Sequence, residues 1–334
     1  MKALPLLAAI AGVAAMAMLV GYFGAGAVIR SLIAVGGPGF AAICAIHLGL
    51  TALMGLAWRA LLPGTHPGRL IWARLVRDSG SEALPLSQVG GYVLGARALA
   101  LSGVSGTLAA ASTIVDVTLE FVAQLAYTAL GLAWLVRLQP ESRVAAPVLL
   151  GLAVAVLAAV GFILVQRRGI GFFDRIARYL GRGWAERGAA GAAALHETLT
   201  DIYRRRGGLW VSFLLHLACW IASAAEVWLA LQLAGEPLPF GAVLAIESLL
   251  YAIRTAAFVV PNAMGVQEGA YLLLGAGFGL TPEMSLALSL LKRGRDLAIG
   301  LPTIAVWQAI ESKRLWRRRS VAAARLSELA PPPD

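Results

Sequence analysis

The strongest constraint in this sequence is a series of long apolar runs, each about the length of a membrane crossing. Residues 146–165 contain no charged side chain, and a helix needs about 20 mostly apolar residues to cross the hydrocarbon core of a bilayer. Four comparable runs lie at 4–24, 39–60, 107–135 and 208–232, and a sixth, at 284–310, carries charges midway. The sequence therefore predicts an all-α polytopic membrane protein with about six full spans.

The composition excludes several other classes of protein. Of the 334 residues, 59% are hydrophobic and 14% are charged, whereas about 25% are charged in ordinary soluble domains. A soluble globular enzyme and a disordered chain are both inconsistent with these values. Cys44 and Cys219 lie in apolar stretches with no metal-binding spacing, so we expect no metal and no other cofactor.

The net charge of +10 is explained by topology. Basic residues gather in the connections 59–82 and 166–207 and after residue 312, which all fall on one side if the N-terminus is cytoplasmic. We therefore predict that both termini are cytoplasmic, that the basic residues contact anionic headgroups, and that the chain has no nucleic-acid partner. The predicted organisation is one transmembrane domain, 1–312, with halves at 1–165 and 208–312, followed by a basic cytoplasmic tail, 313–334.

The connection 166–207 alternates aromatic residues with arginines. This pattern favours helices that lie on the cytoplasmic headgroup layer. A docking surface for a partner protein is the alternative interpretation.

Two segments are apolar but too interrupted for simple spans. Residues 84–105 and 240–281 contain prolines, glycines and polar residues at membrane depth. Broken backbone there is tolerated only inside protein or beside a watery cavity. We predict that both segments are re-entrant helical hairpins. Pro85 and Pro261 interrupt their helices, and Gly90, Gly91, Gly265 and Gly269 allow close backbone approach or a bend. Two ordinary full spans remain the alternative for 240–281.

The two halves of the chain predict an inverted-topology repeat. A shift of 176 residues places Leu84-Pro85 on Val260-Pro261 and Glu120 on Asp296. Residue identity is poor in this comparison, but the order of span, hairpin and charged span recurs with opposite orientation. Such repeats are typical of transporters, whose binding sites lie at the repeat interface near the midplane.

Charged residues inside the apolar segments are the candidate functional residues, because each costs at least about 2.5 kcal/mol at the bilayer centre. They are Arg97, Asp116, Glu120, Glu226, Glu247, Arg254, Glu268, Lys292, Arg293, Arg295 and Asp296. They form either structural ion pairs or the lining of a polar cavity, and both interpretations can hold for different pairs. Glu226 stands alone and is expected to be structural or to lie near the outer interface, and Arg293 is expected to reach toward the interface.

The sequence around these residues resembles the lysylphosphatidylglycerol synthase transmembrane, or flippase-domain, superfamily, and most closely the hopanoid-biosynthesis-associated HpnL-type membrane proteins. The motifs are LPLSQVGGYVLGAR, the D-x-x-x-E of Asp116 and Glu120, and GVQEG followed by LLKRGRD. Where HpnL-like sequences often have an acidic residue after QVGG, this chain has Tyr92. The resemblance implies a multi-pass protein of the bacterial inner membrane that moves or handles a lipid, and it gives no reason to expect the synthetic activity of larger relatives.

The leading functional hypothesis is movement or export of a hopanoid or phospholipid through a polar cavity between the hairpins. The alternatives are a scaffold that binds proteins of hopanoid or lipid synthesis and, less favoured, a lipid-modifying enzyme; we do not expect an enzyme. Asp116, Glu120, Lys292, Arg295 and Asp296 are expected to exchange ion-pair partners with one another as the cavity opens to each side. The other predicted substrate-binding residues are Gln88, Arg97, Glu247, Arg254, Asn262, Gln267 and Glu268.

Overall fold

The computed structural model describes residues 25–82, 88–142, 144–168, 182–257 and 260–328. Within these ranges the chain is helical, with no strand. The span predicted at 4–24 and the predicted break at Pro85 lie outside the described residues.

Four helices are long and apolar enough to cross a membrane. They comprise Ile33–Leu61 within α2 (Ala25–Leu61), α5 (Gly106–Leu138), the Ala145–Gln166 part of α6 (Ala145–Arg168), and α9 (Arg206–Ala234). Each of these four coincides with a span predicted from the sequence. In α6 almost every side chain faces outward, which is the arrangement expected of a helix in contact with lipid.

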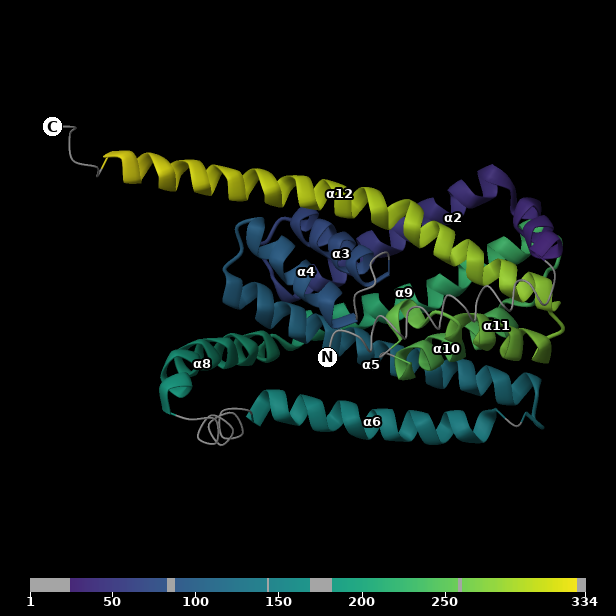
Figure 1. Ribbon diagram of the computed structural model, residues 1–334. Helices are drawn as coiled ribbons and strands as arrows, with labels where there is room; N and C mark the ends of the chain where they lie inside the picture. The colour runs from purple at the N-terminus through teal and green to yellow at the C-terminus, as the bar shows by residue number, and fades with distance from the viewer. Residues whose placement is uncertain (1–24, 83–87, 143, 169–181, 258–259, 329–334) are drawn as a thin grey trace.

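The predicted span at 284–310 is part of a longer element. α12 (Pro282–Glu328) is a single 47-residue helix that passes through Pro302, and it extends beyond the other helices toward the C-terminus (Figure 1). The helix also continues across the predicted boundary between transmembrane domain and tail at residue 312.

Two pairs of short helices lie among the long ones. α3 (Pro67–Glu82) packs along α4 (Gln88–Leu101), and α10 (Phe240–Ala256) packs against α11 (Val266–Gly277), with the 3-10 turn η1 (Pro261–Ala263) between them. α10 and α11 have 17 and 12 residues, so they rise about 25 and 18 Å. Neither length reaches the roughly 30 Å thickness of a hydrocarbon core.

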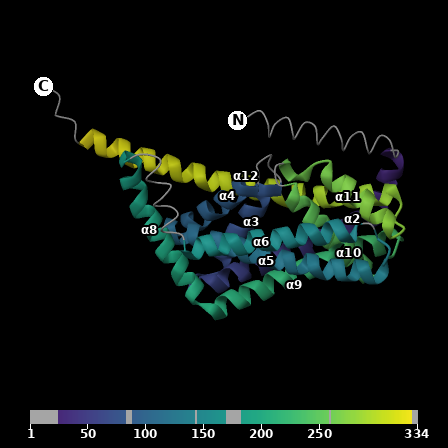
Figure 2. The same ribbon diagram turned by 90° about the horizontal axis from the view of Figure 1, so that it is seen from below.

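The two hairpins occupy opposite ends of the helix bundle. α3 and α4 lie toward the end where α8 (Arg182–Arg204) and the last turns of α12 are found, while α10 and α11 lie toward the other end (Figures 1 and 2). Two apolar clusters accompany this division, one around α10, α11 and α12 and one around α3, α4 and the start of α5.

The first hairpin differs from the prediction. We expected residues 84–105 to form it alone and 59–82 to be a connection on the surface. The structure instead makes 67–82 its first arm, with Arg74 and Arg77 only 4% and 2% exposed. These two arginines are therefore enclosed by protein and do not make the headgroup contacts that we expected of the basic residues in this connection.

Glycines allow the arms of this hairpin to approach closely. A Cβ at Gly91 would lie 2.6 Å from the carbonyl oxygen of Arg77, and one at Gly95 would lie 2.7 Å from the Arg77 Cβ. Contacts this short are incompatible with any side chain. By contrast, a Cβ at Gly269 meets nothing within 4 Å, so close approach does not explain that glycine.

Candidate functional site

The first ion-pair network joins the first hairpin to α5 and α9. Arg74 donates two hydrogen bonds to the Glu120 carboxylate, at 2.7 and 2.9 Å, and a third to Asp78 at 2.7 Å. Arg77 bonds to Asp116 at 2.7 Å and also to Glu120. Bidentate arginine–carboxylate contacts are strong and geometrically specific, so they fix the position of α3 inside the bundle.

His216 on α9 completes this network. Its Nε2 lies 3.0 Å from the carboxylate of Asp116, and both side chains are fully buried. Asp116, Glu120 and Gln124 follow one another at intervals of four residues along α5. Gln124 reaches α10, where it donates to the Tyr251 carbonyl oxygen at 3.1 Å and to the Thr255 hydroxyl at 2.6 Å.

The second network is centred on α12, where charged residues bind three different helices within about one turn. Lys292 donates to Glu247 of α10 at 2.7 Å, and Arg293 donates to Glu268 of α11 at 2.7 Å. Arg295 bonds to Glu226 of α9 at 2.6 Å and to Asp296 at 2.6 Å. α12 thereby holds the second hairpin against α9.

Glu226 is part of a buried ion pair, whereas Arg293 differs from what we expected of it. Glu226 is 4% exposed and has two partners, Arg295 and His47, whose Nδ1 lies 3.3 Å away. Arg293 binds Glu268 instead of reaching toward an interface.

The second hairpin has a tightly bonded turn where α11 begins. The Glu268 carboxylate accepts from the backbone N–H of Gly265 at 2.8 Å and from the Ser289 hydroxyl at 2.7 Å, and Gln267 donates to the same hydroxyl at 2.8 Å. Asn262 and Gly265 have φ values of 49° and 79°, in the left-handed region that asparagine and glycine tolerate best.

The broken end of each hairpin contacts that of the other. The Arg254 guanidinium at the end of α10 lies 3.2 Å from the carboxylate of Glu82 and 3.2 Å from the amide oxygen of Asn262. The Asn262 amide donates to the Glu82 carbonyl oxygen at 2.7 Å. Glu82 is the last residue of α3. We call this group of three residues the hairpin junction.

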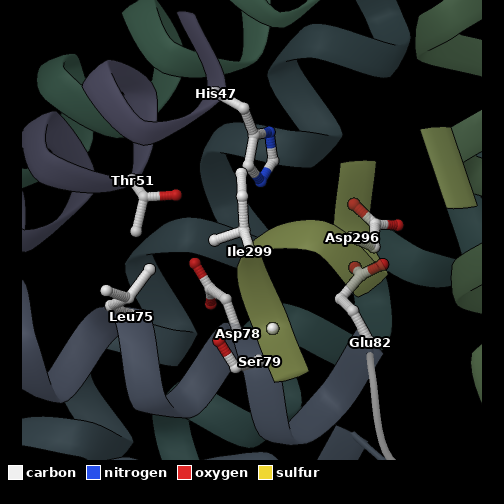
Figure 3. A pocket seen from close by; sticks show the side chains of 9 residues that line it. His47, Thr51, Leu75, Asp78, Ser79, Glu82, Asp296 and Ile299 are labelled. Carbon is white, nitrogen blue, oxygen red and sulfur yellow. The ribbon is translucent and has the colours of Figure 1, made fainter. Parts of the chain in front are cut away.

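A small pocket lies beside the hairpin junction, between α2, α3 and α12. Asp78, Glu82, Asp296 and His47 bring their polar groups to it, and Thr51, Leu75, Ser79, Ile299 and Gly300 complete its lining (Figure 3). The carboxylates come from both networks, because Asp78 is bonded to Arg74 and Asp296 to Arg295. The pocket is therefore where the two networks meet.

The predicted exchange partners are not paired in this structure. Among the described residues, Asp116 and Glu120 form ion pairs with Arg74 and Arg77, and none with Lys292 or Arg295. The link between α5 and α12 passes through Arg74, Asp78 and the pocket.

Two predicted site residues lie away from the hairpin junction. Arg97 is half-exposed in the middle of α4, where it pairs with Glu311 of α12 at 2.7 Å. Gln88 is exposed at the start of α4 and accepts from the Tyr92 hydroxyl at 3.3 Å.

Sequence reasoning missed the charged groups of α3 and both histidines. They are Arg74, Arg77, Asp78, Glu82, His47 and His216. The spacing of Arg74 and Asp78, four residues apart, indicates a helix with an internal ion pair. The histidines stand in apolar runs without a local pattern that marks them as partners of distant carboxylates.

These networks explain how so many charges are held inside an apolar bundle. Removing an ion from water costs several kcal/mol, and only a well-placed partner with further hydrogen bonds compensates for it. Most of these carboxylates have two or more partners, which is the arrangement that such compensation requires. No group of three or more His, Cys, Asp or Glu side chains among the described residues is arranged to hold a metal ion.

Several long apolar helices surround paired interior charges, and two pairs of short helices meet among them. These features define a polytopic membrane protein with a polar interior. The chain belongs to the family described as the lysylphosphatidylglycerol synthase TM region, whose model matches residues 7–302. Comparison with curated proteins and with solved structures gives no match. The family indicates a function related to membrane lipids.

Proposed function

We propose that the protein moves a lipid across the bilayer, with the headgroup passing between the two hairpins while the tails stay in the membrane. The hairpin junction carries this proposal. Glu82, Arg254 and Asn262 join two short helical pairs that point toward each other from opposite ends of the bundle. Opening this contact separates the hairpins without unfolding either one.

In this proposal both hairpins are re-entrant, and the two halves form an inverted repeat. The support is the short length of α10 and α11 and the position of each hairpin at its own end of the bundle. Repeats of this kind place a binding site at their interface, between two related gates. The charged pocket at the junction occupies the corresponding place.

The bonds at the junction suit a gate. The Arg254–Glu82 contacts are 3.2 and 3.4 Å and the Glu82 side chain is 28% exposed, so they are weaker than the short, buried bonds of Arg74 and Lys292. A headgroup with a phosphate or hydroxyl groups offers Arg254 and Asn262 replacement partners as it enters. The strong networks meanwhile keep α5, α9 and α12 in place.

The proposed setting is the bacterial inner membrane, with both termini cytoplasmic and a hopanoid or phospholipid as substrate. The chain acts in this proposal without changing the lipid covalently. The support for the substrate class is membership of the family and the resemblance of the QVGG and GVQEG segments to HpnL-type proteins.

The test uses the full chain reconstituted in vesicles with a fluorescent phospholipid, or a labelled hopanoid, in one leaflet. A disulfide between Glu82→Cys and Asn262→Cys, formed with an added oxidant in a background without Cys44 and Cys219, locks the junction. We expect lipid to equilibrate between leaflets with the uncross-linked protein, to stop on cross-linking, and to resume after reduction.

The matched control places the same cross-link away from the junction. Thr118 and Gln166 join α5 to α6 through a 2.9 Å hydrogen bond, and Thr118→Cys with Gln166→Cys is expected to leave lipid movement unchanged. Mass spectrometry of the recovered lipid separates transport from chemistry. Failure to move any tested lipid, or equal movement with the junction locked, contradicts the proposal.

A further inference from the structure

The buried ion-pair networks contain more carboxylates than cations. Eight carboxylates take part in them, from Asp78, Glu82, Asp116, Glu120, Glu226, Glu247, Glu268 and Asp296. Six permanent cations face them, from Arg74, Arg77, Arg254, Lys292, Arg293 and Arg295. Two of these carboxylates, Asp78 and Glu82, are 24% and 28% exposed, so the excess of negative charge gathers at the pocket, where water, a cation or a proton can compensate for it.

Two histidines contact these carboxylates and are the natural places for protons. Histidine is the side chain whose charge ordinarily changes between about pH 5 and 8. His216 bonds to Asp116 and His47 bonds to Glu226. The two rings differ in the surroundings of their second nitrogen.

The second nitrogen of His216 is enclosed by protein. Its Nδ1 is buried and lacks a hydrogen-bond partner among the described residues, so an N–H there would leave a buried donor unsatisfied. A proton on Nε2, donated to Asp116, fits this environment. His216 therefore orients the Asp116 carboxylate, and it does not face the pocket.

The second nitrogen of His47 is open to the pocket. Nδ1 contacts Glu226, and the ring extends into the space lined by Asp78, Glu82 and Asp296 (Figure 3). The side chain is 27% exposed, so water reaches it. A proton on this nitrogen would face three carboxylates.

An unpaired hydroxyl also points into the pocket. Thr51 is 3% exposed, and its hydroxyl has no hydrogen-bond partner among the described residues although it faces the cavity (Figure 3). A hydroxyl that opens onto an enclosed polar pocket is a suitable partner for a bound water. Water that links His47 to the carboxylates supplies a path for a proton.

We propose that this pocket is a proton-binding site, in which His47 takes a proton from water and shares its charge with Asp78, Glu82 and Asp296. The step is a transfer from hydronium to the free imidazole nitrogen, and it needs no other reactant. His47 contacts Glu226 of α9 and shares the pocket with Asp78 and Glu82 of α3 and Asp296 of α12. Arg295 pairs with Glu226 and Asp296, Arg254 of α10 pairs with Glu82, and Cys44 precedes His47 by three residues on α2.

Proton binding at His47 is expected to affect the hairpin junction, because Glu82 both lines the pocket and pairs with Arg254. An imidazolium in the pocket attracts the Glu82 carboxylate and competes with Arg254 for it. It also attracts Asp296 and Glu226, which Arg295 holds. Protonation thus weakens the junction, and this coupling rests on the function proposed above, whereas the binding site itself does not.

The site is tested first by proton binding alone. We would label the histidines of the full chain with ¹⁵N, place the protein in lipid nanodiscs, and follow the ring signals between about pH 5 and 8. His47→Gln identifies the signal of interest, and His66→Gln, in the exposed connection between α2 and α3, is the matched control. We expect a titrating signal that His47→Gln removes and His66→Gln leaves in place.

A second variant keeps the test independent of the folding of His47→Gln. Glu82→Gln removes one carboxylate from the pocket and leaves the ring intact, so it is expected to change the pH response of the His47 signal. No titration of the His47 signal, or no effect of Glu82→Gln on it, overturns the proton site. We would also replace choline by sodium at constant pH. A change in the His47 signal on this replacement would indicate a bound metal cation and would overturn the assignment to protons.

The coupling is tested in vesicles with lipid movement as the readout. We expect the rate of lipid movement in the wild type to depend on pH and the dependence to be lost in His47→Gln. If the rate of lipid movement does not depend on pH, the coupling is refuted and the proposed function is unaffected. Proton binding without any lipid movement refutes the proposed function but leaves the site standing.

Discussion

The substitution Arg254→Gln is expected to weaken the hairpin junction without unfolding the protein. One nitrogen of Arg254 makes all three contacts, at 3.2 to 3.4 Å, to Glu82 and Asn262. These distances lie at or beyond the long end of the normal range, and Glu82 is partly exposed to solvent. The amide bond from Asn262 to the Glu82 backbone survives the substitution.

The loss is worth about 1 to 2 kcal/mol, between the values for an exposed ion pair and for a hydrogen bond to a charged group. That change shifts a two-state population about 5- to 30-fold. The variant is therefore expected to populate the open junction more often while the bundle stays folded. If opening limits transport, lipid movement accelerates by up to the same factor.

The assay combines distance measurement with lipid movement. Spin labels on Val93→Cys of α4 and Leu273→Cys of α11, both strongly exposed positions, report the separation of the hairpins. Arg97→Gln is the matched control, because this arginine forms an exposed ion pair in the same hairpin but away from the junction. A stable Arg254→Gln protein with unchanged label distances and unchanged lipid movement would refute the reasoning.

The remaining predictions concern the strong networks and the packing of the first hairpin. Arg77→Met leaves two buried carboxylates short of a partner and is expected to cost about 3 to 5 kcal/mol, measured as loss of thermal stability in detergent; wild-type stability would contradict it. Lys292→Met is expected to cost a similar amount, and adding Glu247→Gln should recover much of it because the unpaired charge is then absent; additive losses in the double variant would rule this out. Gly91→Ala brings a methyl group against the Arg77 backbone and the Ser81 side chain, and a cost of about 1 to 3 kcal/mol is expected in the same assay; a neutral effect would show that α4 can move away from α3.

Hydropathy predicts the long helices well because their outer faces meet lipid. α6 shows this best, since almost all of its side chains are apolar and face outward. The same reasoning fails for α3, whose arginines resemble those of a surface connection. A helix that compensates its charges through partners on other helices carries no apolar signature of its own.

The sequence also identifies charged residues more reliably than their partners. The common face of Asp116 and Glu120 follows from helical periodicity alone. Their pairing with Arg74 and Arg77 depends on the packing of α3 against α2, α4 and α12, which periodicity does not report. The unpaired state of Thr51 and the second nitrogen of His47 likewise become visible only once α2, α3 and α12 are placed together.

The short charged segment of α12 has a mechanical consequence. Lys292, Arg293 and Arg295 are rigidly spaced along one helix, yet each binds a different neighbouring helix. A rotation or sliding of α12 would strain all three attachments together, so releasing only one of them gains little freedom. Any large rearrangement of this end of the protein should consequently be concerted, with sharply defined resting positions and few stable halfway arrangements.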